Sequence, residues 1–344
     1  MGLDSNAERL RKFRFLPQII AAIIPRPHPL QNEYLRMITQ QDSHQCPLCG
    51  SDDVTLVKCV RSGQLVDEWS RGLSIDISSQ LGGHKEIKLY ECRESKLRFF
   101  KPNNIAGDGA FYDQLSTSNG YYMSWKWEHE IAFQSLQPNE SVLEIGCGKG
   151  TFVERVKSKL GSHSEGIELN EAAAHQCREK GIPVSVMDIR EVASLRAGEF
   201  DVVCAFQVLE HIPDPHDFLG AAIQLVRPGG RLLLCVPNND SFLRHQWNLL
   251  DMPPHHMTQW TAESFKSLEH VFPVKLIAAH TEPLASYHVK GFVSTYAKHY
   301  GRRSMIHKLA WNGLTRLALR GVLRTGIRRL LCGQSLYAEL KRTA

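Results

Sequence analysis

The sequence lacks any apolar run long enough to cross a bilayer. A faint secretion-signal pattern, a basic cluster before Phe15–Ile24, is interrupted by Pro17 and followed by prolines instead of a small-residue cleavage site. The myristoylation pattern also fails, because Asn6 stands where Ser or Thr is needed. We therefore expect a cytoplasmic protein.

The sequence also lacks the cysteine pattern that is typical of a disulfide framework. The nine cysteines are scattered along the chain, and several, such as Cys204 and Cys235, lie inside apolar runs typical of strands. This distribution is typical of reduced core thiols and not of a secreted disulfide framework.

Acidic residues are missing from one long stretch. Between Pro283 and Ala338 there is no Asp or Glu, although the net charge of the chain is only +5. The stretch carries ten cationic residues, which are Lys290, Lys298, Arg302, Arg303, Lys308, Arg316, Arg320, Arg324, Arg328 and Arg329. Four of these arginines recur every fourth residue from Arg316, which predicts one helical ridge. We expect a basic helical insertion over residues 285–331 that contacts an anionic membrane, or else packs as a docked helix or an oligomer contact.

The most informative stretch that is present runs from Val142 to Gly150. An apolar strand ends in Glu144, and Gly146, Gly148 and Gly150 follow at every second position before a helical pattern begins. Glycines let the backbone approach a ligand closely. The third glycine comes one residue too early for a dinucleotide fingerprint. A carboxylate before the turn would repel a pyrophosphate but suits an amine or a sulfonium.

Strand-like and helical patterns alternate from residue 141 to residue 236, as in a parallel sheet covered by helices. Glu168 ends the second strand about twenty residues past the glycine turn, where a carboxylate can accept both hydroxyls of a ribose. Asp188 follows the third strand, at a place that also suits an ordinary helix N-cap.

These motifs resemble those of the class I S-adenosylmethionine-dependent methyltransferases. The glycine stretch is similar to motif I, Glu168 to motif II, and Asp188 with Ile189 to the adenine-binding pair. The resemblance implies an α/β fold with a doubly wound, seven-stranded Rossmann-like sheet, and S-adenosylmethionine as cofactor. The cofactor-binding residues that it implies are Glu144, Gly146, Cys147, Gly148, Gly150, Glu168, Leu169, Asp188, Ile189 and Gln207.

The segment from Gln207 to Pro215 resembles the motif after the fourth strand in small-molecule methyltransferases of the ubiquinone-biosynthesis type. Some relatives hold a divalent metal there with a Glu-x-x-Glu-His pattern. Gln207 replaces the first Glu of that pattern, which argues against a catalytic metal. His211 is still a candidate general base, since an imidazole titrates near neutrality. Alternatively, it only shapes the cofactor pocket.

A second histidine-bearing segment runs from Pro253 to Thr261 and resembles the Pro-Pro-His-His segment of the same family. His255 and His256 are therefore candidates for taking a proton from an acceptor hydroxyl. The alternative is a loop–helix junction capped by Thr261.

Cys46 and Cys49 form a zinc-knuckle pattern with a glycine behind it. The pattern around Cys92 resembles the second half of the zinc ribbon that precedes many bacterial sugar- and polysaccharide-associated methyltransferases, but Ser95 replaces the last thiol. We predict Cys46, Cys49 and Cys92 as zinc ligands, with a fourth from Cys59, His44 or His84. The alternative is a metal-free remnant of the ribbon. Residues 51–88 are expected to add a β-hairpin.

The predicted organisation has five parts. A basic arm with a short helix near residues 31–39 covers 1–43, a degenerate zinc-ribbon-like module covers 44–105, and the methyltransferase core covers 106–284. The basic insertion covers 285–331 and the final antiparallel strand 332–344. Within the core, an aromatic-rich helical pattern from residue 111 to residue 136 is expected to border the cofactor.

Together these features predict methyl transfer from S-adenosylmethionine to a hydroxyl of a sugar, glycan or lipid-linked saccharide. A quinone or phenolic precursor is the alternative acceptor. A zinc-ribbon protein that binds nucleic acid is less favoured, because the knuckle is incomplete and no aromatic-interleaved basic surface is evident. No nucleic-acid partner is expected, and the basic insertion places the protein at the inner membrane surface.

Overall fold

The computed structural model describes residues 45–116, 125–301 and 311–343. The predicted basic arm, its helix near residues 31–39 and His44 lie outside the described residues. No helix in the described ranges is long and apolar enough to span a membrane.

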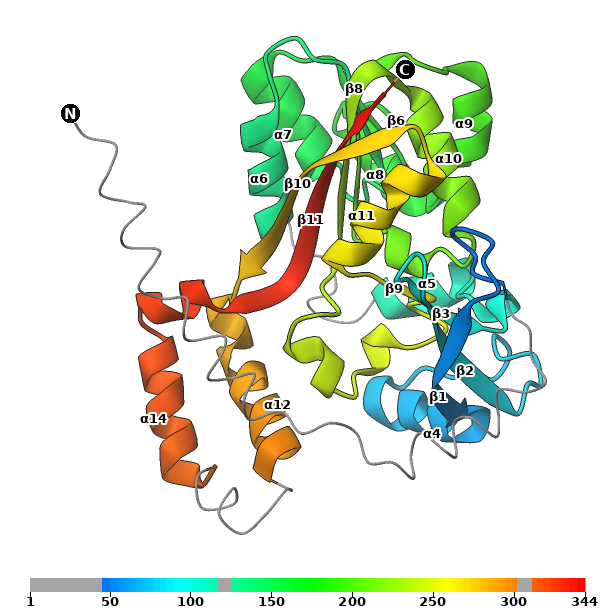
Figure 1. Cartoon of the computed structure of the whole chain (residues 1–344). Coiled ribbons are helices and arrows are strands. Elements are labelled where there is room, and N and C mark those ends of the chain that lie inside the picture. Colours follow the sequence, from blue (N-terminus) through cyan, green and yellow to red (C-terminus); the bar gives the residue numbers. More distant parts are fainter. Residues whose placement is uncertain (1–44, 117–124, 302–310, 344) are drawn as a thin grey trace. The chain divides into compact units, whose positions relative to one another are not determined.

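A seven-stranded sheet forms the core, in the order β10-β11-β8-β7-β4-β5-β6 (Figure 1). The five strands from β8 to β6 in this order are parallel, and β11 runs antiparallel between β8 and β10. This confirms the predicted seven-stranded Rossmann-like sheet. The strands are β4 (Val142–Ile145), β5 (Ser164–Ile167), β6 (Val184–Ser185), β7 (Phe200–Phe206), β8 (Val226–Pro237), β10 (Val274–Pro283) and β11 (Cys332–Arg342).

Helices connect the strands and cover both faces of the sheet, with α6 and α7 on one side and α9, α10 and α11 on the other (Figure 1). Every residue of β4 is buried, as expected for a central strand covered on both faces. The helices of this layer are α6 (Trp127–Ser135), α7 (Thr151–Leu160), α8 (Glu171–Glu179), α9 (Ile189–Leu195), α10 (Pro215–Leu225) and α11 (Ala262–Val271). Short 3-10 turns are η1 (Asn103–Ile105), η2 (Leu209–His211), η3 (Phe242–His245), η4 (Leu249–Asp251) and η5 (Ser286–His288).

The N-terminal module contains β1 (Val54–Arg61), α4 (Ser62–Leu73), β2 (Glu86–Cys92) and β3 (Arg98–Lys101). Strands β1 and β2 pair antiparallel as in the expected β-hairpin, but the helix α4 lies between them in sequence, so that expectation is wrong in part. Leu65 and Trp69, four residues apart on α4, are both fully buried in the core of the module. That helical spacing is the local reason for the helix.

The module shares its four-stranded sheet with the main domain. The strand order is β1-β2-β3-β9, and β9 (Thr258–Gln259) comes from the segment just after the histidine pair. Phe100 N–H also donates to the Met257 backbone oxygen over 2.9 Å. Met252 and Met257 are buried in the same apolar cluster as Trp69. The module is therefore joined to the core by strand pairing and by side-chain packing.

The predicted helical stretch from residue 111 to residue 136 appears as two helices, α5 (Gly109–Ser116) and α6, while residues 117–124 lie outside the described ranges. α5 packs into the module through Phe111. Trp125, just before α6, packs against Phe133 of α6 and Phe152 of α7 in the core of the main sheet. The aromatics therefore dock these helices on the two cores.

The C-terminal insertion is helical where it is described, with α12 (Val289–Gly301), α14 (Gly313–Leu323) and η6 (Gly326–Leu330). The expected single arginine ridge is wrong in part. Arg316 and Arg320 lie on α14, but Arg324 is its C-cap residue and Arg328 belongs to η6. The hydroxyl of Thr325 accepts from Ile327 N–H, which starts a new turn and ends the ridge.

Candidate active site

The glycine turn lies where β4 ends at the carboxyl edge of the sheet. Gly146, Gly148 and Gly150 all have positive φ angles, of 69°, 51° and 68°. A Cβ added at Gly146 would lie 2.6 Å from Val208 Cγ2, so the turn is closed tightly against the segment after β7. Gly150 is the N-cap residue of α7. The turn therefore needs glycine both for its backbone angles and for its packing.

A cavity of 410 Å³ opens beside this turn. It is bordered by the carboxyl ends of β4 and β7, by residues 250–256 and by the adjacent ends of β10 and β11. Open α/β sheets bind ligands at this edge. Eight of the residues predicted from sequence line the cavity, namely Glu144, Gly146, Cys147, Gly148, Gln207, His211, His255 and His256.

The cavity wall is rich in buried carboxylates. Glu128, Glu144, Glu210 and Glu282 line it, against the two cations Lys126 and Lys149. Burial, with the negative charge of Glu168 nearby, raises the pKa of Glu144 well above its usual value. Within the described residues, Glu144 Oε2 is buried without a hydrogen-bond partner. An acidic wall of this kind favours a cationic ligand.

Glu168 turns toward the glycine loop. Its Oε2 accepts a hydrogen bond from Gly148 N–H over 2.9 Å, and its Oε1 accepts one from Asn170 N–H over 2.9 Å. Leu169 beside it is 68% exposed. Glu168, Leu169 and Gly150 do not line the 410 Å³ cavity, but the Glu168 hydrogen bond ties the second predicted acid directly to the glycine turn.

Asp188 and Ile189 lie outside the cavity lining. The Asp188 side chain accepts from Arg190 N–H over 2.9 Å and pairs with Arg190 Nε over 2.8 Å, so it caps α9 as in the alternative stated above. That pairing lowers the pKa of Asp188 below its usual value. Ile189, the first residue of that helix, is buried.

Gln207 has a φ of 57°, which is unusual for a residue with a side chain. Its Nε2 donates to Glu128 Oε1 over 3.2 Å, and its backbone N–H donates to the Cys235 oxygen over 2.7 Å. The side chain therefore faces α6 and the cavity wall. Backbone strain of this kind is concentrated at functional sites.

The three predicted catalytic histidines come together in one cluster. The ring centroids of His211 and His255 are 4.5 Å apart, those of His211 and His256 are 4.9 Å apart, and those of His255 and His256 are 4.4 Å apart. Burial lowers the pKa of His211 to about 4 and the pKa values of the other two well below their usual value. All three imidazoles are therefore neutral at physiological pH and offer a lone pair.

Residues 120–271 match a family model described as a methyltransferase domain. The region holds the glycine turn, Glu168 and the post-β7 segment in the order described above. The chain contains a class I S-adenosylmethionine-dependent methyltransferase domain.

Curated relatives of this methyltransferase domain are named ubiquinone biosynthesis O-methyltransferase. The protein from Aromatoleum aromaticum is 40% identical over 105 residues, covering 29% of this chain and 44% of the relative. The one from Methylococcus capsulatus is 36% identical over 113 residues, covering 31% and 47%. That from Bordetella avium is 35% identical over 126 residues, covering 34% and 51%. The chain thus spans about half the length of these relatives.

Solved structures with similar chain traces include a SAM-dependent methyltransferase from Archaeoglobus fulgidus, at 20% identity and a TM-score of 0.40, covering 62% of this chain and 94% of that one. A geranyl diphosphate C-methyltransferase from Streptomyces coelicolor has 15% identity and a TM-score of 0.41, covering 63% and 78%. The fold of the methyltransferase domain is assigned here from its own strand order.

Several residues around the methyltransferase cavity escaped the sequence analysis. Glu128 and His129 come from α6, and Glu282, Tyr287 and His288 come from the end of β10 and from η5. Burial lowers the pKa of both histidines to about 4. None of them belongs to a motif of the domain. The one available signal was Glu282, the last acid before the long acid-free stretch.

The predicted zinc ligands also come together. Ligand atoms of Cys46, Cys49 and Cys92 all lie within 4.8 Å of one another. Cys49 Sγ is 3.6 Å from Cys92 Sγ, and Cys46 Sγ is 3.3 Å from Ser95 Oγ. Cys59 and His84, two of the predicted candidates for a fourth ligand, do not join this set, and Ser95 Oγ lies next to the Cys46 thiol. Burial raises the pKa of the Cys46 thiol to about 12.

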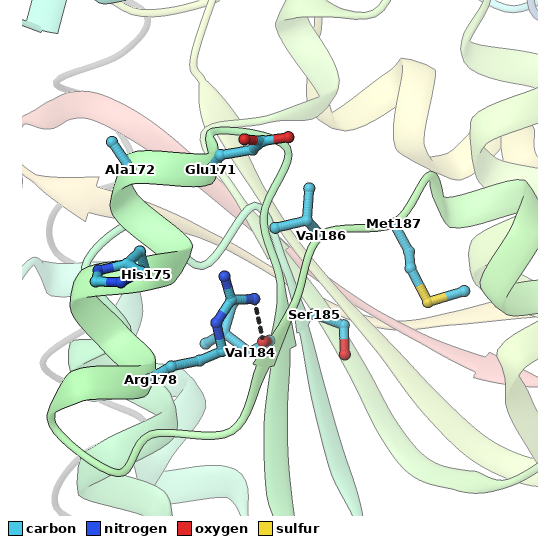
Figure 2. A pocket seen from close by; sticks show the side chains of 8 residues that line it. All are labelled: Glu171, Ala172, His175, Arg178, Val184, Ser185, Val186 and Met187. Carbon is cyan, nitrogen blue, oxygen red and sulfur yellow. Dashed lines mark hydrogen bonds between the residues drawn. The ribbon is translucent and has the colours of Figure 1, made fainter.

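A second hollow of 750 Å³ lies at the outer edge of the sheet, between α8 and β6 (Figure 2). Arg178 donates there to the Val184 oxygen over 3.3 Å (Figure 2). None of the predicted site residues lines this hollow. The chemistry of the domain is therefore assigned to the 410 Å³ cavity.

Proposed function

We propose that the protein is an O-methyltransferase that moves the methyl group of S-adenosylmethionine to a hydroxyl of a small phenolic or quinone-precursor molecule. One observation carries this proposal, which is that the glycine turn, the histidine cluster and Glu144, whose Oε2 has no hydrogen-bond partner within the described residues, share one cavity.

The residues at the glycine turn suit the donor. The buried Glu144 oxygen lacks a partner within the described residues and gains one from a positively charged ligand. Glu168 already contacts the turn through Gly148 and is the expected ribose ligand. The donor supplies a methyl group that is already activated as a sulfonium. The protein then has to align the acceptor and remove its proton.

The histidine cluster provides the place for that proton. The acceptor hydroxyl loses its proton, its oxygen forms the bond to the methyl carbon, and the carbon–sulfur bond breaks to leave a neutral thioether. His211, His255 and His256 are neutral and line the cavity, so each offers a nitrogen lone pair toward the acceptor.

The relatives favour a quinone or phenolic acceptor over the saccharide predicted from the sequence, because the three described above carry the name of ubiquinone biosynthesis O-methyltransferases. The test is a transfer assay with radiolabelled S-adenosylmethionine on catechols, quinols, nucleotide sugars and lipid-linked saccharides. Transfer to catechols or quinols supports the proposal. Transfer to the saccharides alone would overturn the choice of acceptor, and transfer to none would overturn the activity.

We also propose that Cys46, Cys49 and Cys92 hold a structural zinc ion, with Ser95 at the fourth corner. Three converging sulfur atoms and a Cys-x-x-Cys turn support this site. It would fasten the turn at residues 46–50 to the end of β2.

A third proposal concerns the described part of the insertion, which we assign to an anionic membrane surface. Exposed apolar side chains follow one another along α14 and η6, and Leu314, Leu317 and Leu330 are 78%, 66% and 77% exposed. Arg324 and Arg329 are exposed beside them, and the nearest acids in sequence are Glu282 and Glu339. Apolar and cationic side chains together suit anionic lipid.

A further inference from the structure

The histidine cluster has a second use. We propose that His211, His255 and His256, together with the carboxylate of Glu210, form a binding site for a divalent transition-metal ion such as Zn²⁺. The role given to this ion below depends on the proposed methyl transfer, whereas the site itself does not.

The ligand atoms already converge. One ligand nitrogen from each of the three histidines lies within 4.8 Å of those of the other two. Glu210 Oε1 lies 3.9 Å from His211 Nε2 and 4.0 Å from His256 Nε2. Nitrogen ligands around a tetrahedral zinc ion lie about 3.3 Å apart. Side-chain shifts of about 1 Å would therefore bring the three histidine nitrogens to ligand distance, with Glu210 beside two of them.

Each imidazole is also oriented for ligation. His211 Nδ1 donates to the His255 oxygen over 2.7 Å, and His255 Nδ1 donates to the Leu250 oxygen over 2.8 Å. His256 Nδ1 lies 3.3 Å from Asp251 Oδ1. Because an oxygen accepts at Nδ1 of each ring, the ring proton lies on Nδ1. The lone pair of each imidazole is therefore on Nε2. Metal-binding histidines are held by such a contact to a carbonyl or carboxylate.

Glu210 gives an independent indication of a missing ligand. Its residue is 1% exposed, and Oε2 has no hydrogen-bond partner within the described ranges. A buried carboxylate oxygen without a partner is costly, and a cation would supply that partner.

This ligand set differs from the Glu-x-x-Glu-His pattern considered in the sequence. Gln207, at the place of the first Glu, carries an amide, and its Nε2 donates to Glu128 Oε1. The additional ligands come instead from His255 and His256, more than forty residues later in the chain. Residues 207–211 taken alone argue against a metal. The fold, however, brings His255 and His256 next to His211.

Imidazole-rich sites select Zn²⁺, Co²⁺, Ni²⁺ or Fe²⁺ rather than Mg²⁺ or Ca²⁺. A site of this kind that also faces a cavity can accept the oxygen of an acceptor hydroxyl as a further ligand. The cation lowers the pKa of that hydroxyl. Its proton then passes to solvent, the oxygen takes the methyl carbon, and the sulfur keeps the electron pair of the broken bond. In this form the histidines act through the ion and no single imidazole is the base.

The experiment measures metal binding on the full chain, apart from catalysis. Because the thiol set also binds zinc, calorimetry with Zn²⁺ is done on the Cys49→Ala/Cys92→Ala double variant. We expect one equivalent to bind there. Adding His211→Gln or His256→Gln should weaken that binding at least about 100-fold, and adding Asp251→Asn should weaken it about 10- to 100-fold. The matched control is His288→Gln, which lines the same cavity outside the set and should leave binding unchanged.

Equal Zn²⁺ affinity with and without the histidine substitutions would overturn the site. A second measurement uses the wild-type chain without any substitution: its absorption spectrum is recorded as Co²⁺ is added. Bands from thiolate ligands alone at two equivalents of Co²⁺ would contradict the proposal, and added bands of a nitrogen and oxygen environment would support it. Full methyl transfer by metal-free protein would reject the role of the ion but leave the proposed function standing. Metal binding without methyl transfer would reject the proposed function, and with it the role of the ion, but leave the metal site standing.

Discussion

His211 Nδ1 donates a hydrogen bond to the backbone oxygen of His255 over 2.7 Å, across 44 residues of sequence. This bond joins the turn after β7 to the loop before β9. The neighbouring residues form a second link, since Met257 N–H donates to the backbone oxygen of Glu210 over 2.8 Å. Because β9 pairs with β3, the small N-terminal module holds the loop that carries two of the three histidines.

The glycine turn gives the first prediction. Gly146→Ala should lower both stability and donor affinity, because the new methyl group meets Val208, which leads into the turn that carries Glu210 and His211. We expect a loss of about 2–4 kcal/mol in the free energy of unfolding, measured with urea. The matched control is Gly161→Ala. Gly161 has a similar φ of 63° but open space around it, and its loss should be about 1–2 kcal/mol. Equal losses at the two positions would contradict this account of the turn.

A second prediction concerns stability at acid pH. Burial alone would raise the pKa of Glu165, but hydrogen bonds and the charge of Arg196, with help from His163, lower it below its usual value. The ionised carboxylate therefore stabilises the fold above the pKa of the unfolded chain, and this contribution disappears as the pH falls through the lower folded pKa. Arg196 holds both carboxylate oxygens, at 2.7 and 3.0 Å.

The test is Glu165→Gln, which should lower stability at pH 7 by about 1–3 kcal/mol and flatten the loss of stability between about pH 5 and pH 3. Glu199→Gln is the control, since Glu199 pairs with the same arginine but is 49% exposed. If Glu165→Gln leaves the dependence of stability on pH unaltered, the Glu165–Arg196 pair is not linked to folding.

Much of the main sheet could be predicted from sequence, because strands such as β7 are mostly buried apolar runs and helical patterns alternate with the strands. The glycine turn could be predicted for the same reason, since its spacing and the carboxylate of Glu144 are local features. The helix α4 also had a local signal, the spacing of Leu65 and Trp69, which the hairpin interpretation overlooked.

Other features depend on long-range pairing and have no local signal. The pairing of β9 with β3 involves only Arg98 with Gln259 and Phe99 with Thr258, too few residues to recognise in a sequence. The three histidines were each candidates, but only the fold shows that they share one cluster with Glu210. The four-residue spacing of the arginines predicted a helix. It could not show that α14 ends before Thr325, where a new turn begins.

The thiol set predicts a zinc-dependent stability. Removing zinc with a strong chelator should lower the melting temperature by several degrees, because the ion fastens the 46–50 turn to β2. Cys49→Ala should lower it similarly and make it insensitive to the chelator. Cys59→Ala is the control, since Cys59 is exposed and stands outside the set. Zinc content that is the same in the Cys49 variant and the wild type would contradict the site.

The insertion predicts binding to charged lipid. Sedimentation with vesicles should show binding to phosphatidylglycerol but not to phosphatidylcholine, and added salt should weaken it. Leu317→Ser with Leu330→Ser should reduce binding at least severalfold. Leu195→Ser is the control, because Leu195 is 67% exposed but lies on α9, away from the insertion. If the double variant changes the oligomeric state and not vesicle binding, the apolar face is a contact between copies of the chain.

Calorimetric titration with S-adenosylmethionine tests the central claim most directly. We expect one equivalent to bind to the wild-type chain and NAD not to bind. Because Glu168 is tied to the glycine turn through Gly148 N–H, Glu168→Ala should weaken the binding at least about 10-fold, a loss of about 1.4 kcal/mol or more. Glu179→Ala, an exposed acid at the far end of α8, should leave it unchanged. A folded wild-type chain that binds no S-adenosylmethionine, or an undiminished affinity in Glu168→Ala, would contradict it.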